Sequence, residues 1–176
     1  DVPVAQDTGM AVDAPAMEDA GADAGGGEDA PAMVDAGPVT CFPLSGPSPD
    51  LPDAIPSSFT AASPTWMRPT GEECPATALG DVAVPFDTVC YENDTGADID
   101  VLFEMLVGEE DLRPAVVIYD GTAIPSDAMG CAAVSSDLVI DAAEAFYTVP
   151  DGAMITFVAT VQEPGTGDFQ FVITPE

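Results

Sequence analysis

The stretch that decides the fold is FYTVPDGAMITFVATVQEPGTGDFQFVIT, residues 146–174. Side chains alternate in character over residues 154–161 and again over residues 169–174, and the turn-forming sequence EPGTG separates the two runs. A period of two in residues rich in β-branched and aromatic side chains, bounded by Pro and Gly, is typical of paired antiparallel strands. The last two strands of the chain are therefore expected to pair with each other.

More short strands are expected upstream, from about residue 76 onwards. Turn signals such as NDTG at residues 93–96 separate them, and no segment has the pattern of an amphipathic helix. This arrangement indicates an all-β fold, an antiparallel β-sandwich. The side chains expected to face its core are Ile99, Val101, Phe103, Met105 and Val107, with Val117 and Tyr119 or their neighbours. The expected strands are 77–84, 86–91, 99–107, 112–119, 131–134, 138–140, 146–149, 154–161 and 169–174.

Residues 1–40 form an acidic arm of low complexity, made mostly of Asp, Ala, Gly and Pro, with nine acidic residues and no basic or aromatic one. The sequence DAPAMEDAG at residues 13–21 recurs as DAPAMVDAG at residues 29–37. This composition is typical of a disordered spacer, because it buries too little apolar surface to offset its ordering entropy. Even positions from 2 to 16 are nevertheless mostly apolar, a weak strand-like alternation that predicts contact with a neighbouring copy. The expected assembly residues are Val2, Val4, Met10, Val12 and Ala14.

Residues 41–75 are expected to be a connector rich in Pro, Ser and Thr, and residues 76–176 to be the sandwich domain. Eight prolines favour an extended, semi-rigid backbone in the connector. Its scattered apolar residues make it too apolar for a free linker. We therefore expect it to pack along the domain surface, with Trp66, the only Trp of the chain, as its anchor.

The charge of the chain excludes several functions. Thirty-two acidic residues face two basic ones, and the formal net charge is −30. This charge argues against binding to nucleic acids or anionic membranes, because phosphate groups require neutralisation by Lys or Arg. The chain has neither histidine nor lysine, so catalysis by a histidine base or a lysine nucleophile is excluded. The protein is expected not to be an enzyme and to require no cofactor.

The four cysteines, Cys41, Cys74, Cys90 and Cys131, form no CxxC motif and have no histidine beside them. They therefore predict two disulfides and an oxidising compartment rather than a zinc site. Three pairings are open, and Cys74–Cys90 with Cys41–Cys131 is favoured because it would join neighbouring strands. The start at Asp1 suggests a processed secreted protein, located outside the cell or at its surface. The apolar runs have only the length of strands, which predicts no membrane insertion.

The acidic turn near residue 95 is a candidate site. Carboxylates gather around a Gly between two expected strands, and oxygen ligands on a loop suit Ca²⁺. A solvated acidic turn is the competing interpretation. The candidate calcium ligands are Glu92, Asp94, Asp98 and Asp100. The sequence NDT at residues 93–95 is an N-glycosylation sequon, which makes Asn93 a candidate glycosylation site, although an unmodified turn explains it equally.

Three segments resemble the bacterial pre-peptidase C-terminal domains: LRPAVVIYDG at residues 112–121, VPDGAMITFVATV at residues 149–161 and GDFQFVI at residues 167–173. The resemblance covers about residues 76–174. It implies a secreted, jelly-roll-like sandwich without catalytic activity, of a family usually attached to secreted enzymes or surface proteins. Some members of that family bind calcium or polysaccharide. The Asp/Ala/Gly-rich arm is similar to tethers in secreted proteins of Gram-negative bacteria.

Two functions remain open. In the first, the protein is the structural subunit of an extracellular fibre or coat, and its arm adds as a strand to the sheet of a neighbouring copy. In the second, it is a monomeric, surface-tethered module that binds polysaccharide, calcium or a protein partner, with residues 1–40 as a flexible spacer. Resistance of residues 1–40 to proteolysis would favour the first function, and rapid trimming the second.

Overall fold

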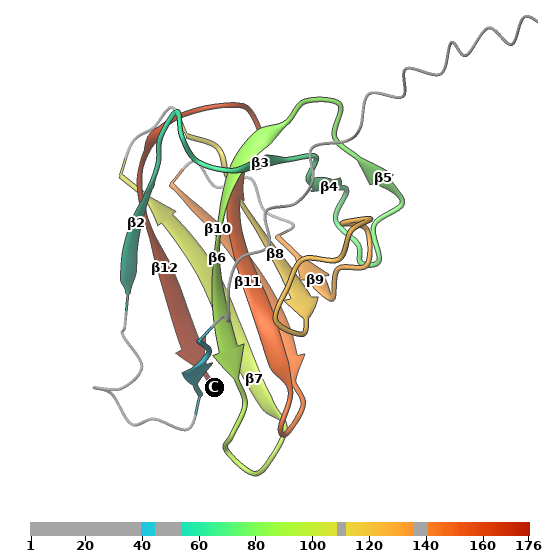
Figure 1. Ribbon diagram of the computed structural model, residues 1–176. Helices are drawn as coiled ribbons and strands as arrows, with labels where there is room; N and C mark the ends of the chain where they lie inside the picture. Colours follow the sequence, from blue (N-terminus) through green and yellow to red (C-terminus); the bar gives the residue numbers. More distant parts are fainter. Residues whose placement is uncertain (1–39, 45–53, 109–111, 136–140) are drawn as a thin grey trace, which may run out of the picture. The chain divides into compact units, whose positions relative to one another are not determined.

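The computed structural model describes residues 40–44, 54–108, 112–135 and 141–176 (Figure 1). These residues form strands and turns without any helix, so none of them belongs to a helix that could cross a membrane. The strands are β1 (Phe42–Pro43), β2 (Ile55–Phe59), β3 (Thr65–Trp66), β4 (Pro69–Thr70), β5 (Ala78–Leu79), β6 (Val84–Glu92), β7 (Ile99–Val107), β8 (Pro114–Asp120), β9 (Ala133–Val134), β10 (Ala142–Val149), β11 (Met154–Val161) and β12 (Gly167–Pro175).

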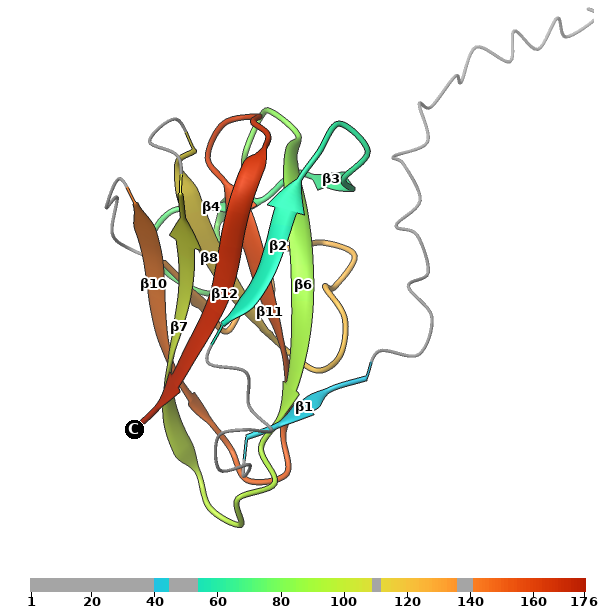
Figure 2. The same ribbon diagram turned by 90° about the vertical axis from the view of Figure 1, so that its left-hand side faces the viewer.

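Two sheets make the sandwich. The first sheet has the order β1-β6-β11-β8-β9, with β3 also paired to β6. The second sheet has the order β10-β7-β12-β2, and Figure 2 shows its four strands side by side. Except for the parallel pair β1–β6, every pairing between these strands is antiparallel. The prediction of an all-β antiparallel sandwich is therefore confirmed.

The six longest strands alternate between the sheets along the chain: β6, β8 and β11 belong to the first sheet, and β7, β10 and β12 to the second. The expectation that the last two strands pair with each other is therefore wrong. β11 pairs with β6 and β8, whereas β12 pairs with β7 and β2. The link between β11 and β12 crosses from one sheet to the other, so their apolar faces meet across the interior instead of lying side by side.

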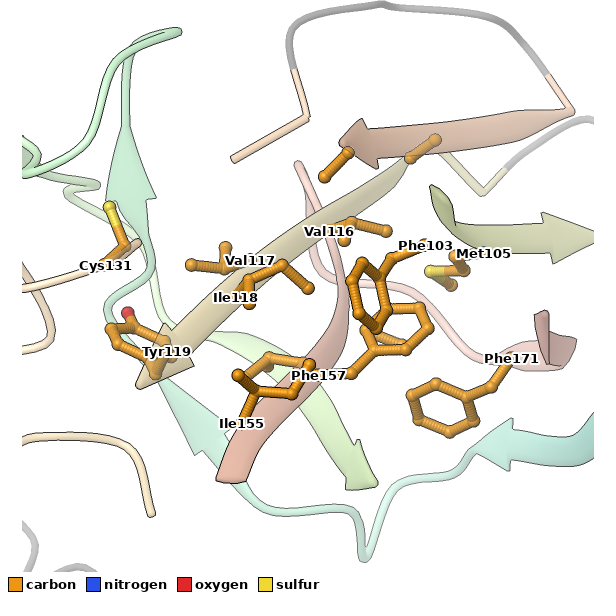
Figure 3. Close-up of a cluster of buried hydrophobic side chains, with 14 of the residues drawn as sticks. Phe103, Met105, Val116, Val117, Ile118, Tyr119, Cys131, Ile155, Phe157 and Phe171 are labelled. Atoms are coloured by element: carbon orange, nitrogen blue, oxygen red, sulfur yellow. The ribbon is translucent and has the colours of Figure 1, made fainter. Parts of the chain in front are cut away.

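A chain of aromatic rings fills the space between the sheets. Neighbouring ring centroids are 4.4–6.2 Å apart along the series Phe59, Phe169, Phe171, Phe157, Phe103 and Tyr91. Figure 3 shows Phe103, Phe157 and Phe171 together, with Met105 and Ile118 close by. Of the predicted core residues on β7, Val101, Phe103 and Met105 are fully buried, while Ile99 and Val107 pack against the core from the strand ends.

β11 is buried on both faces, because a second apolar layer covers the outside of the first sheet. The Trp66 ring lies against Phe86 and Tyr119, with centroids 5.5 and 6.2 Å away. Its indole Nε1 donates to Thr160 Oγ1 at 3.1 Å, and the Thr160 hydroxyl donates to the Pro85 carbonyl at 2.7 Å. Tyr119 donates from its hydroxyl to the Ala128 carbonyl at 2.5 Å. Trp66 therefore anchors the connector to the domain, as the sequence predicts.

The connector is part of the sandwich, so the boundary expected at residue 76 does not separate a linker from a domain. β2 forms one edge of the second sheet, and β1 and β3 both pair with β6. Prolines fit this arrangement because edge strands tolerate the missing N–H. The expected strand 77–84 shrinks to β5, which pairs with β4, while the strand expected at 146–149 begins earlier, at Ala142. The strand expected at 138–140 lies outside the described residues.

Two disulfides are present, but the favoured pairing is wrong. Cys41 bonds to Cys90, and Cys74 bonds to Cys131, with Cα–Cα distances of 4.4 and 5.3 Å. Cys90 points away from the interior on β6, next to the parallel partner β1 that follows Cys41 directly. Cys74 lies in a loop, not in a strand beside β6, and its bond joins that loop to the segment before β9. Neither pairing can be recognised from the residues around the cysteines, because each bond joins segments that only the tertiary structure brings together.

Candidate functional site

The acidic turn between β6 and β7 is built around a buried asparagine. Asn93 is 0% exposed, and its Nδ2 donates to the carbonyls of Ala97 and Val149, both at 2.8 Å. Its Oδ1 accepts from the Thr95 backbone N–H at 3.1 Å and from the Thr95 hydroxyl at 2.7 Å. A glycan on Nδ2 would replace one of the two donated hydrogens in a closed space. Burial of the side chain therefore argues against a glycan at Asn93, and glycosylation there stays a prediction.

The predicted calcium ligands are spread along this turn. Asp98 accepts from the Asp151 N–H at 3.0 Å, and Asp100 accepts from the Thr148 hydroxyl at 2.5 Å. Glu92 lies at the end of β6, opposite Met154, and Asp94 is exposed on the turn. In the described segments, no three acidic, histidine or cysteine side chains gather in a group that could hold a metal ion. Calcium binding at this turn stays a prediction.

The predicted assembly residues of the arm, Val2, Val4, Met10, Val12 and Ala14, lie outside the described residues.

Among the described strands, β10 is an open edge of the second sheet, because β7 is the one strand of the described residues that pairs with it. Val107 donates from its N–H to the Asp141 carbonyl at 3.0 Å, which identifies these opposite residues as a hydrogen-bonded pair. Hydrogen-bonded and non-hydrogen-bonded pairs alternate along an antiparallel ladder. The β10 residues that hydrogen-bond to β7 are therefore the odd-numbered ones, and the backbone N–H and C=O groups that point away from β7 belong to Ala142, Glu144, Phe146 and Thr148.

This edge has few of the features that usually protect sheet edges from other strands, which are proline, lysine, bulges and short length. β10 has eight residues, no proline and one charged side chain, Glu144. By comparison, β2 carries Pro56, and β1 and β9 have only two residues each. Among the strands that the structure describes, β10 is the long edge that can accept another strand.

The inner side of β10 is held firmly in the sandwich. Ala143 and Ala145 are buried, and the Tyr147 hydroxyl donates to Asp120 Oδ1 at 2.7 Å. Burial, followed by the hydrogen bond to Asp120 and its charge, raises the pKa of Tyr147 to about 12. The edge is therefore a fixed template, since its inner side chains connect it to the opposite sheet.

The outer face of the second sheet mixes apolar and acidic side chains. We call it the acidic–apolar face. Phe146 is 64% exposed and Leu106 is 36% exposed, and both point outward. They lie on neighbouring strands on either side of the Glu104–Glu144 pair, and exposed apolar side chains on one face of a sheet are typical of interaction surfaces. The residues of the acidic–apolar face are Leu102, Glu104 and Leu106 of β7, Glu144 and Phe146 of β10, and Val172 of β12.

Two carboxylates lie directly opposite each other in the middle of this face. Glu104 of β7 and Glu144 of β10 form a non-hydrogen-bonded pair, the arrangement in which opposite side chains are closest. Partial burial, and secondly the charge of Glu144, raise the pKa of the Glu104 carboxyl. The two arginines are bonded elsewhere: Arg113 lies 3.6 Å from Glu163, and Arg68 donates to the Pro69 carbonyl at 3.0 Å.

An open groove adjoins the acidic–apolar face where β2, β12 and the end of β7 meet. It has a volume of about 630 Å³. Its lining combines apolar and polar side chains, among them Pro56, Ser58, Leu106, Asp168 and Gln170.

The open edge and the acidic–apolar face were not predicted from the sequence. Glu144 lies before the strand predicted at 146–149, so its position opposite Glu104 did not emerge from the pattern. The alternation AEAFYT at residues 143–148, which puts Glu144 and Phe146 on one face, was the available signal.

Together, the fold and its bonds define a disulfide-linked antiparallel β-sandwich domain. No protein-family model and no curated protein matches the chain. Among solved structures, the chain is similar to the pre-peptidase C-terminal domain of a collagenase from Bacillus anthracis, with a TM-score of 0.45 and 11% sequence identity. The match covers 78% of this chain and 97% of that one. That domain belongs to the family that the strand motifs of this chain resemble.

Proposed function

We propose that the protein is a non-catalytic extracellular structural protein, a subunit of a surface fibre or coat, in which the N-terminal arm of one copy adds as a strand to β10 of the next. The observation that carries the proposal is the open edge of β10. Four of its residues direct their backbone N–H and C=O groups away from the sheet. A strand from another copy would supply the missing hydrogen bonds, and its alternate side chains would provide specificity.

The arm has a suitable pattern and sufficient length for this role. Its mostly apolar even positions between residues 2 and 16 can occupy one face of an added strand. The residues between 16 and 40 span about 80 Å when fully extended, which is enough to reach a neighbouring molecule. A contact between two different surfaces need not close into a ring, and an open series of such contacts produces a filament.

Two further observations support an extracellular protein without catalytic activity. Both disulfides, Cys41–Cys90 and Cys74–Cys131, suit an oxidising compartment. The chain has no histidine or lysine for acid–base or nucleophilic catalysis.

Negative-stain electron microscopy of the native secreted material, taken without refolding, tests this function. We expect regular filaments or a coat with a repeat near the size of one sandwich. In the assembled state, the arm should resist thermolysin, a protease that does not require Lys or Arg at its cleavage site. A version lacking residues 1–16 should give single particles. Single particles from the full chain at high concentration would refute the structural role.

The groove beside β2 favours a second candidate, a surface-tethered module that binds polysaccharide, with residues 1–40 as a spacer. Hydroxyl, amide and carboxylate groups of Ser58, Gln170 and Asp168 line it together with apolar side chains, a mixture that suits sugar rings. Rapid trimming of the arm, together with retention of the monomer on an immobilised polysaccharide, would favour this function over assembly.

A further inference from the structure

We propose that the acidic–apolar face binds a cationic protein segment, one that carries lysine or arginine beside an apolar side chain. This site is separate from the β10 edge of the proposed function, because it uses outward side chains and not backbone groups. It would therefore be available to a partner in an assembled fibre as well as in a single molecule.

The side chains lie in ordered rows across the sheet. Phe146, Leu102 and Thr174 lie opposite one another on β10, β7 and β12. In the next row, Glu144 faces Glu104, and Glu104 faces Val172. Each carboxylate therefore has an apolar side chain two residues away on its own strand. A partner that places a cation between the two carboxylates would place its neighbouring apolar group against Phe146 or Leu106.

The charge of the face selects the partner. Another copy of the protein carries a net charge of −30, and the arm has nine acidic residues, so the outward carboxylates attract neither. Addition of the arm at β10 would depend on backbone hydrogen bonds, whereas the outward side chains favour a cationic partner. Asp100, which lies on the same face of β7, adds to the negative charge of the face. Oppositely charged groups are attracted to the face, and they also associate faster with it. The occupant that the charge favours is thus a basic segment of a different protein.

The pair Glu104–Glu144 itself favours a cationic partner. Like charges directly opposite each other in a sheet are destabilising. Partial burial increases the effect, because it weakens the screening by water around Glu104. A guanidinium or ammonium group of a partner can donate hydrogen bonds to both carboxylates, which would remove this repulsion in the complex.

Fluorescence anisotropy of labelled peptides tests the site in the full chain. The probes are a peptide of alternating lysine and leucine and its counterpart with serine in place of leucine, at about 0.15 M salt. The double substitution Glu104→Gln and Glu144→Gln is compared with Glu72→Gln and Glu73→Gln, which removes the same two charges from an exposed loop. We expect about tenfold weaker binding of the lysine–leucine peptide for the first variant and a change below about twofold for the second. Equal losses in the two variants would overturn the proposal, because they would show attraction by net charge alone.

The apolar part of the site has its own test. Phe146→Ser should weaken binding of the lysine–leucine peptide about fivefold and leave the lysine–serine peptide unaffected, since the exposed ring contributes only to an apolar contact. If Phe146→Ser bound each of the two peptides as tightly as the unsubstituted protein does, the proposal would be overturned. Because Glu104 lies on β7 and not on the acceptor strand β10, electron microscopy of the single variant Glu104→Gln should still show assemblies. The peptide test and the assembly test can therefore fail independently.

Discussion

The Asn93 side chain joins two turns that lie far apart in the sequence. Its amide donates within its own turn to Ala97 and across 56 residues to Val149, at the end of β10. The backbone continues this connection, because Asn93 N–H donates to the Ala153 carbonyl and the Asn93 carbonyl accepts from Gly152. A side chain that satisfies this many buried polar groups is a structural residue.

Replacement of Asn93 should therefore destabilise the protein. In Asn93→Ala, the buried carbonyl of Val149 loses its side-chain donor and that of Ala97 keeps only the Thr95 hydroxyl, so we expect the free energy of unfolding to fall by about 2–4 kcal/mol. Thr95→Ala, which removes only an exposed hydroxyl partner of Asn93, should cost less than about 1 kcal/mol. Urea denaturation followed by tryptophan fluorescence measures both values. A glycosylated Asn93 in the intact mass of the folded protein would contradict this account.

The Glu104–Glu144 pair predicts a stabilising substitution. Glu104→Gln removes one of the opposed charges, and we expect a gain of about 0.5 kcal/mol at neutral pH, kept small by the solvent around the pair. The pKa of Glu104 is higher in the folded protein than its ordinary value of 4.5, so folding favours the protonated form. The contribution of protonated Glu104 to the free energy of unfolding is fully present below the ordinary pKa of 4.5. It is lost as the pH rises through the higher pKa of the folded protein. The advantage of Glu104→Gln should thus appear at neutral pH and disappear below about pH 4.

Thermal unfolding between pH 3.5 and 7.5 provides this comparison, with Glu73→Gln in the exposed loop as a control for net charge. A stabilisation that stays the same over the whole pH range, or an equal gain in the control, would show that the opposed charges are not its cause.

At the scale of the element, β10 combines two opposite properties. Its odd-numbered residues hydrogen-bond to β7 and direct their side chains toward the interior, whereas its even-numbered residues direct both side chains and backbone groups away from the fold. A substitution at an even position can therefore change what the edge accepts while the sandwich itself stays intact.

Glu144→Pro tests the acceptor edge on this basis. Proline removes the N–H of residue 144, which points away from β7, so the existing ladder keeps its hydrogen bonds. We expect the variant to fold, with an unfolding midpoint within about 5 °C of the unsubstituted protein, and to form no filaments in electron micrographs. Glu144→Ser removes the same charge and retains the N–H, so it should assemble normally. Filaments of equal length from both variants would show that β10 is not the acceptor.

At the scale of the whole molecule, the disulfides connect peripheral segments to the sandwich. Cys41–Cys90 holds the chain to β6 just after the arm, and Cys74–Cys131 closes the apolar layer over the outside of the first sheet. A segment of two residues such as β1 has little pairing of its own, and its attachment depends on the neighbouring covalent bond. The net charge of −30 increases the need for such bonds, because repulsion within the molecule favours expansion.

Removal of either disulfide should lower stability by a similar amount. The bonds close loops with sequence separations of 49 and 57 residues, for which the chain-entropy model predicts about 4 kcal/mol each. We expect this loss in guanidinium denaturation of Cys41→Ser/Cys90→Ser and of Cys74→Ser/Cys131→Ser. Peptide mapping without reduction should recover Cys41 linked to Cys90. Recovery of a Cys74–Cys90 peptide would instead support the pairing that the sequence favoured.

The sequence by itself determined the class of fold and the inward faces of several strands. Alternation with a period of two is a local property, and it identified Val101, Phe103 and Met105 on β7 as core residues. The even number of cysteines and the missing histidine and lysine likewise follow from composition alone. Trp66 was recognisable as an anchor because a connector that exposes so large a side chain would be unfavourable.

Only the tertiary structure decided which segments are neighbours. The separation of β11 and β12 into different sheets, the pairing of Cys90 with Cys41, and the position of Glu144 opposite Glu104 all join residues remote in the sequence. The free energy of closing a loop changes slowly with its length, so competing partners differ little in local cost. The choice among them depends on packing of the whole interior, and the open edge of β10 and the acidic–apolar face are consequences of that choice.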